Sequence, residues 1–169
     1  KLDAGVSNPR GEYGDKDYYS FYRGKITPYT DSYKTYDDES VEAAVSYING
    51  RKAEDGQPFC LFLGLNYPHP PYQVEEPYFS KIDRSKLPPR VPNIPFDENT
   101  PSILKTIRKE QNIHDYSEAE WDELRACYLG MCMKVDEQVG MLCEALKNAN
   151  IYDDTAIFFF SDHGDFTGD

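Results

Sequence analysis

The sequence predicts an α/β fold, a partial α/β/α sandwich with a mostly parallel central sheet. Two short apolar runs, 58–65 and 155–161, have the composition of strands that are buried on both faces. A helical pattern precedes each run, over about 39–51 and about 118–149. Helices that alternate with buried strands are typical of a parallel sheet covered on both sides.

The first 36 residues are rich in Tyr, Gly and Asp and show neither helix nor strand periodicity. We expect an irregular segment over 1–36 that can include short strands. Residues 37–169 carry the helical and strand patterns and are assigned to one α/β domain, in which we find no internal repeat.

The first helix is expected over about 39–51, with Asp37 or Asp38 as its N-cap. Gly50 and Gly56 bracket its end. Its apolar residues recur at helical spacing and should form one face: Val41, Ala44, Val45 and Ile48.

Pro58 opens the first predicted strand, and residues 66 to about 100 hold most of the prolines. Proline fixes φ and removes a hydrogen-bond donor, so this stretch is expected to be a long ordered loop. A loop of such length within a compact domain is usually functional or disordered.

The strongest helix signal begins at Ser117, which forms a capping box with Glu120. From there apolar residues step by three or four positions as far as Asn148. The predicted buried stripe consists of Trp121, Leu124, Tyr128, Met131, Val135, Val139, Leu142 and Leu146.

Composition limits the range of functions. The chain has 169 residues and a net charge of −12, which argues against a protein that binds nucleic acid through phosphates. No apolar run approaches the roughly 20 residues that span a bilayer. The four cysteines form no Cys-x-x-Cys pair, so we expect free, buried thiols.

Polar residues follow the second predicted strand directly, in the order Asp162, His163, Gly164. A carboxylate and an imidazole at the carboxyl end of a strand can hold a divalent cation with ligands from elsewhere. Oxygen ligands suit Ca²⁺ or Mg²⁺, and the imidazole extends the choice to Mn²⁺ or Zn²⁺. The alternative is a structural turn in which Asp162 caps the next element.

His69 follows the first predicted strand and lies between prolines. Histidine is the usual proton donor near neutral pH, which makes His69 a candidate catalytic acid. If the two strands are parallel, His69 and His163 emerge at the same sheet edge. The alternative is a surface histidine in a structural loop, and His114, in a polar stretch, is expected to be exposed to solvent.

Three segments resemble motifs of the sulfatase branch of the alkaline phosphatase superfamily. They are Pro58–Tyr72 with its Pro-His-Pro-Pro-Tyr, Tyr128–Leu146 with Val-Asp-Glu-Gln-Val-Gly, and Ile151–Asp165 with Ser-Asp-His-Gly-Asp. The resemblance implies an alkaline-phosphatase-like fold and hydrolysis of small sulfate esters. It also implies that Asp162 and His163 bind a metal, usually Ca²⁺, and that His69 assists the leaving group.

The resemblance further implies a formylglycine nucleophile, made from a Cys or Ser in a Cys/Ser-x-Pro-x-Arg motif. No cysteine of this chain begins such a motif, so the formylglycine is expected outside it. The N-terminal Asp pair of the family is also missing. We therefore expect a central fragment of a metal-dependent sulfatase, with 37–169 as part of the catalytic domain and no activity in isolation.

Two other functions stay open at this point. A phosphonate monoester hydrolase or phosphodiesterase of the same superfamily would share the metal pair and the histidine loop. A non-catalytic acidic module that binds a partner through residues 1–36 belongs to a different class, but it gives no reason for two histidine motifs on one sheet edge.

Overall fold

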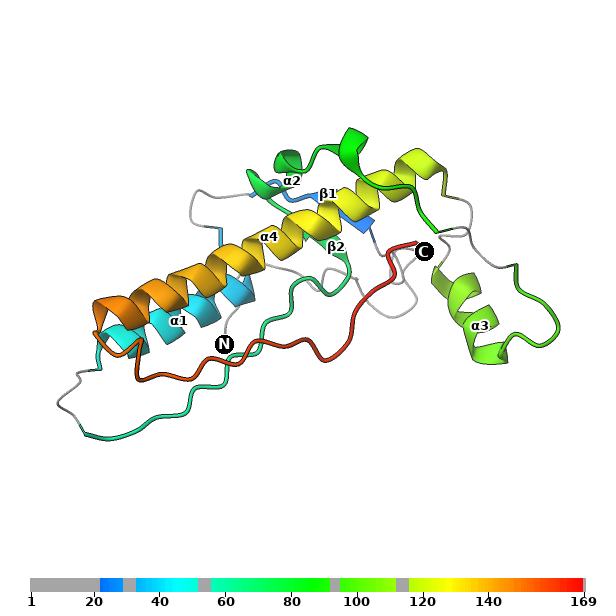
Figure 1. Cartoon of the computed structure of the whole chain (residues 1–169). Coiled ribbons are helices and arrows are strands. Elements are labelled where there is room, and N and C mark those ends of the chain that lie inside the picture. The colour runs from blue at the N-terminus through cyan, green and yellow to red at the C-terminus, as the bar shows by residue number, and fades with distance from the viewer. Residues whose placement is uncertain (1–21, 29–32, 52–55, 92–94, 112–115, 169) are drawn as a thin grey trace.

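The structure is a computed structural model that describes residues 22–28, 33–51, 56–91, 95–111 and 116–168 (Figure 1). Its elements follow in the order β1 (Tyr22–Lys25), α1 (Tyr36–Asn49), β2 (Tyr72–Val74), α2 (Tyr78–Lys81), the 3₁₀ turn η2 (Arg84–Lys86), α3 (Ser102–Gln111) and α4 (Glu118–Asn148). The long helix α4 contacts most of the other elements. Helix α1 runs alongside its C-terminal half, and β1, β2 and α2 pack on its N-terminal half.

The prediction for α4 is confirmed in its bounds, its cap and its buried side. The Ser117 side chain accepts from the backbone of Glu120, and the Glu120 carboxylate accepts from the backbone of Ser117. Of the eight stripe residues five are buried and three partly buried, and none is exposed: Trp121, Leu124, Met131, Val135 and Leu146, then Tyr128, Val139 and Leu142.

Helix α1 is confirmed, but its predicted N-cap is wrong. Thr35 caps the helix, and Asp38 is its reciprocal partner in a capping box. Asp37 is instead turned into the protein and is only 2% exposed. The predicted apolar face packs inward, with Val41, Ala44 and Ile48 buried.

The prediction of central strands at 58–65 and 155–161 is wrong. Both segments are extended but belong to no ladder, and the sheet of the described residues contains only β1 and β2, paired in parallel with Tyr22 opposite Tyr72. Phe62 is 83% and Phe158 84% exposed. The apolar pattern identified segments suited to burial, but a strand also needs a hydrogen-bonded neighbour, which these described residues do not provide.

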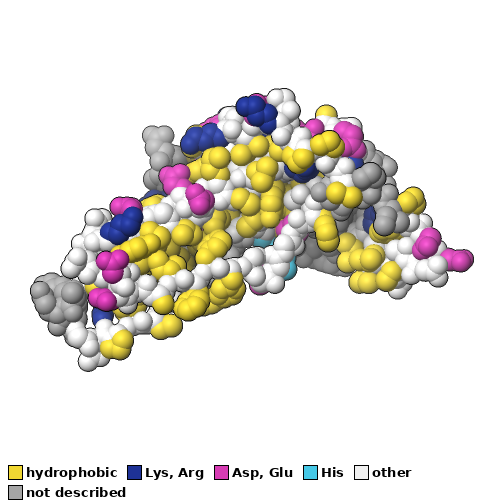
Figure 2. Space-filling model, in the orientation of Figure 1, with side chains coloured by type: hydrophobic (Ala, Val, Ile, Leu, Met, Phe, Trp, Pro, Cys, Tyr) yellow, Lys and Arg dark blue, Asp and Glu magenta, His cyan; other side chains and the backbone are white. Residues whose placement is uncertain are grey.

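Figure 1 shows both extended segments below α1 and α4, and Figure 2 shows apolar side chains gathered over this face of the molecule. The α/β class is thus confirmed only in a coarse form, as helices with a small parallel sheet.

The proline-rich stretch is also more structured than predicted. Within 66–100 lie β2, α2 and η2, which are three or four residues long and therefore too short to show a period. Strand β1 falls in the segment predicted to be irregular, whose residues 1–21 lie outside the described residues.

The main core lies between β2 and the N-terminal half of α4. It is formed by Tyr72, Val74, Trp121, Leu124, Cys127 and Met131. All four cysteines are free as predicted, but Cys60 is exposed, because it lies in an extended segment that packs in no sheet. Over the described residues, no helix combines the length and the low polarity needed to cross a membrane.

Two glycines of α4 provide a matched test of this packing. A Cβ at Gly130 would lie 2.8 Å from the backbone oxygen of Tyr78, whereas a Cβ at Gly140 would meet nothing within 4 Å. We expect Gly130→Ala to lower the free energy of unfolding by about 1–2 kcal/mol, because the clash outweighs the gain in helix propensity. Gly140→Ala should raise it by about 0.5–1 kcal/mol.

Urea unfolding followed by circular dichroism measures both variants. Equal stabilisation by the two alanines would show that α2 does not pack against α4 as closely as the structure has it.

Candidate active site

The first predicted site residue, His69, is held on a short turn before β2. Pro70, Pro71 and Tyr72 are buried and anchor the turn, while His69 itself is exposed. Its ring nitrogen Nδ1 lies 2.6 Å from the carbonyl oxygen of Pro70. Because a carbonyl can only accept, Nδ1 carries a proton and donates it there. The second nitrogen, Nε2, is the one left for chemistry.

The second predicted pair, Asp162 and His163, lies in an open loop. The backbone N–H of His163 donates to Asp162 Oδ1 at 3.0 Å, and Nε2 of His163 lies 4.0 Å from Asp162 Oδ2. The Asp162 side chain is 88% exposed. Both candidate metal ligands are therefore accessible from solvent.

The structure brings the two loops together. The rings of His69 and His163 lie 6.4 Å apart between centroids, at an angle of 68°. Histidine side chains accordingly appear near the middle of the face shown in Figure 2. The loops lie close together, but not at a shared sheet edge as predicted, because the segments that lead into them are not paired strands.

A second contact joins the same two loops. Burial raises the pKa of Tyr72, and the neighbouring Asp165 carboxylate raises it further. The Tyr72 hydroxyl therefore stays neutral beside the anion. Since Tyr72 also packs edge-on against Tyr128 of α4, with centroids 5.7 Å apart, this contact fixes the 161–165 loop near the main core.

The segment after that loop is fixed to the start of α4. Gly168 has a φ of +104° and lies so close to the Trp121 ring that any Cβ would overlap it. The guanidinium of Arg90 lies 4.9 Å from the centroid of Trp121, donates to the Gly168 carbonyl and pairs with Glu118 at 2.6 Å. The chain that follows the Asp162–His163 pair is thus restrained at Asp165 and at Gly168.

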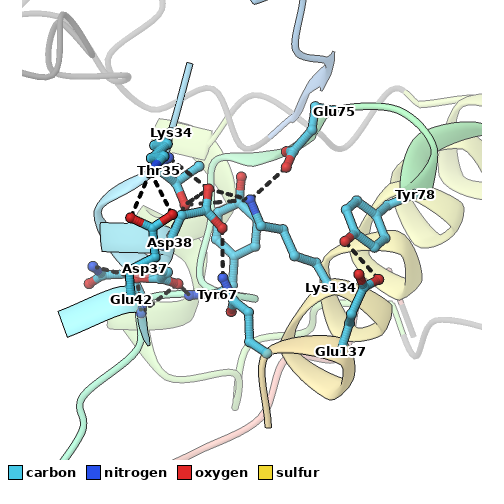
Figure 3. A network of polar contacts seen from close by, with 12 residues as sticks. Lys34, Thr35, Asp37, Asp38, Glu42, Tyr67, Glu75, Tyr78, Lys134 and Glu137 are labelled. Atoms are coloured by element: carbon cyan, nitrogen blue, oxygen red, sulfur yellow. Dashed lines mark hydrogen bonds and ion pairs between the residues drawn. The ribbon is translucent and has the colours of Figure 1, made fainter. Parts of the chain in front are cut away.

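Behind the His69 loop lies a buried polar network (Figure 3). The ammonium of Lys134, in a side chain only 3% exposed, donates to Asp38 at 2.7 Å and to Glu75 at 2.6 Å. Gln138 donates to the other oxygen of Asp38 at 2.9 Å. Burial alone would raise the pKa of Asp38, but the hydrogen bonds and charge of Lys134 and the bonds from Thr35 outweigh it and lower that pKa.

Sequence reasoning missed Lys134. It follows Met131 by three residues and so lies on the buried side of α4. A lysine is almost never buried without a partner, so this position in the sequence could have indicated an ion pair. The third histidine considered, His114, lies outside the described residues.

The two predicted metal ligands, Asp162 and His163, are joined by no third ligand among the described residues. In the described stretches of the chain, no three or more His, Cys, Asp or Glu side chains are grouped so that they could hold a metal ion. An open groove of about 670 Å³ lies elsewhere, between α1 and α4, and none of the three predicted site residues lines it. We place the candidate site at the histidine loops, because no histidine is among the residues that line the groove.

Comparison with known proteins identifies the family. The family model described as Sulfatase matches residues 5–169, so the chain belongs to the sulfatase family and shares its alkaline-phosphatase-like fold.

Several curated relatives are similar over most of the chain. The multifunctional alkaline phosphatase superfamily protein PehA of Trinickia caryophylli is 32% identical over 142 residues, which cover 76% of this chain and 27% of that protein. Choline-sulfatase of Rhizobium meliloti (strain 1021) is 32% identical, with 79% of this chain and 27% of the relative covered. Arylsulfatase K of Danio rerio is 32% identical, with 74% and 26% covered. The chain thus spans about a quarter of the length of these relatives.

The lowered pKa of Asp38 predicts how stability depends on pH. A carboxyl whose folded pKa is depressed contributes stability above its unfolded pKa, near 3.8, and loses it as the pH falls through the lower folded value. We expect Asp38→Asn to lower the free energy of unfolding by about 1–3 kcal/mol at pH 7, and the difference from wild type to shrink below about pH 4.

Denaturant unfolding across this pH range measures the effect. Glu42→Gln is the control, because Glu42 lies on the exposed side of the same helix and pairs only with the exposed Lys34 among the contacts described here. A pH-independent difference for Asp38→Asn would mean that Asp38 is not held as an anion by Lys134.

Proposed function

We propose that this chain is part of a metal-dependent hydrolase of small sulfate esters, in which His69, Asp162 and His163 belong to one active site. The observation that carries the proposal is the 6.4 Å separation of the His69 and His163 rings. Two motifs nearly a hundred residues apart meet there in a chain of the sulfatase family.

His69 is the proposed acid at the leaving oxygen. Its Nδ1 proton is engaged by the Pro70 carbonyl, so a proton delivered to an ester comes from Nε2. His69 must therefore be an imidazolium when it acts, with both nitrogens protonated. A nearby anionic ester favours that charged form, and an imidazolium placed at the leaving oxygen can protonate an alkoxide or phenoxide.

Asp162 and His163 are the proposed ligands of a divalent cation, most readily Ca²⁺, with Mn²⁺, Mg²⁺ or Zn²⁺ as alternatives. They fit as part of such a site, because one accessible carboxylate and one accessible imidazole lie side by side in the same loop. When bound, the cation neutralises charge on the non-bridging oxygens of the ester. Two ligands alone should hold it weakly.

The remaining chemistry is proposed to come from outside this stretch of sequence. A formylglycine nucleophile would lie elsewhere in a longer polypeptide, since no cysteine here begins the required motif. The whole domain is proposed to contain a central, mostly parallel sheet, although 58–65 and 155–161 pair in no sheet within the described residues, and the chain alone is expected to be inactive.

A second candidate, hydrolysis of phosphonate monoesters or phosphodiesters, has one specific observation in its favour. The relative PehA, of 32% identity, is described as a multifunctional alkaline phosphatase superfamily protein. Sulfate and phosphonate esters present similar tetrahedral oxygens to a cation and an acid, so the described residues serve either substrate.

The experiment is a steady-state assay of the complete polypeptide with an aryl sulfate and with the matching aryl phosphonate. We expect the sulfate to be the better substrate. His69→Ala should lower kcat about 10²–10⁴-fold, the usual contribution of a general acid. Asp162→Ala should abolish most activity and weaken metal binding.

Glu42→Gln, on the exposed side of α1, is the matched control and should leave the rates unchanged. Wild-type rates in a His69→Ala, Asp162→Ala double variant would contradict the proposal, and a preference for the phosphonate would support the second candidate.

A further inference from the structure

The carboxylate of Asp37 is buried at the start of α1 and faces the chain just before His69. The backbone N–H of Asn66 donates to its two oxygens at 3.0 and 3.1 Å, and that of Tyr67 donates at 2.8 Å. The side-chain amide of Asn66 adds a bond of 3.3 Å. The Asp37 side chain thus accepts all the hydrogen bonds that the backbone N–H groups of Asn66 and Tyr67 donate among the described contacts.

These anchored amides lie within the turn that presents His69. The N–H of His69 donates to the carbonyl of Asn66 at 2.8 Å, which closes the turn. The ring of His69 is then oriented by the Pro70 carbonyl. A displacement of Asn66 and Tyr67 would therefore be passed to His69 through one short turn.

The chemistry of the contact requires a carboxylate. Both oxygens accept, and no atom of the group donates, so it matches a set made up only of N–H donors. An asparagine of the same shape would offer one acceptor and would turn an amide toward the donors. The charge is further stabilised by the position of Asp37 in the first turn of α1.

The Asp37 anchor is itself fixed in the protein. The neighbouring Asp38 joins α1 to Lys134 of α4, and the ammonium of Lys134 also lies 5.5 Å from the centroid of the Tyr67 ring (Figure 3). The turn is therefore held at two points. The Asp37 carboxylate binds the backbone N–H groups of the turn, and the Lys134 ammonium lies over the ring of Tyr67.

We propose that Asp37 is a positioning residue for His69, acting through the amides of Asn66 and Tyr67. The role of His69 rests on the proposed function above, but the positioning itself does not. Asp37 touches no reacting atom, so it determines the position of the His69 ring and takes no part in the proton transfer.

The test is nuclear magnetic resonance on the full chain, comparing wild type, Asp37→Asn and the control Glu42→Gln. In wild type, the amides of Asn66 and Tyr67 should be protected from hydrogen exchange, and imidazole nitrogen shifts should show the His69 proton on Nδ1. In Asp37→Asn the protection should fall at least about tenfold, as expected for lost bonds to a charged group, and the His69 tautomer should become mixed. Glu42→Gln should leave both readouts unchanged.

The His69 tautomer distinguishes a positioning role of Asp37 from a merely structural one. Hydrogen exchange at the amide of Met131, in α4, reports the global stability of each variant. Unprotected Asn66 and Tyr67 amides in wild type would overturn the proposal even if the variant failed to fold. An unchanged His69 tautomer in folded Asp37→Asn would also overturn it. Neither result depends on turnover, so failure of the proposed sulfatase activity would be recognised separately, by the absence of hydrolysis in the complete polypeptide.

Discussion

The described arrangement depends on the two ion pairs that the buried ammonium of Lys134 forms with Asp38 and Glu75. The ammonium joins α4 to α1 through Asp38 and to Glu75, the residue directly after β2, so it connects segments that are far apart in sequence. Removal of one partner from a buried pair typically costs about 3–5 kcal/mol, because the other charge stays buried. The turn that carries His69 is attached to the same junction through Asp37 and Tyr67.

This junction explains how the candidate site can be organised although 58–65 and 155–161, the described segments that lead into it, pair in no sheet. The two histidine loops are held from behind by helices, by the Asp37 anchor at 66–67 and by the contacts of Tyr72 and Gly168 with the core. The extended segments that lead into the loops are meanwhile exposed and apolar. Their composition matches buried strands, which agrees with a chain that spans about a quarter of its relatives' length.

The elements that the sequence predicted well are those whose signals are local. Helix α4 was found from its capping box and from apolar residues spaced along one face, and both features depend only on nearby positions. The strands at 58–65 and 155–161 were wrong because pairing depends on a partner that the pattern does not specify. Strand β2 was missed because a strand of three residues shows no alternation.

The candidate site shows the same division. His69, Asp162 and His163 were found because a proline frame and an Asp-His pair after an apolar run are visible in the sequence. Asp37 was taken for a helix cap, since any acidic residue at that position fits a cap, and only the fold shows that Thr35 caps while Asp37 faces the loop. No local pattern marks that contact, because it joins residues 29 and 30 positions apart.

We propose that the two histidine loops form one site. The most direct measurement is the nuclear Overhauser effect between ring protons of His69 and His163 in the full chain. The centroid separation of 6.4 Å predicts cross-peaks between the two rings, which should disappear on His163→Ala. Sharp, assigned ring signals for both histidines without any cross-peak between them would show that the two loops lie apart and do not form one site.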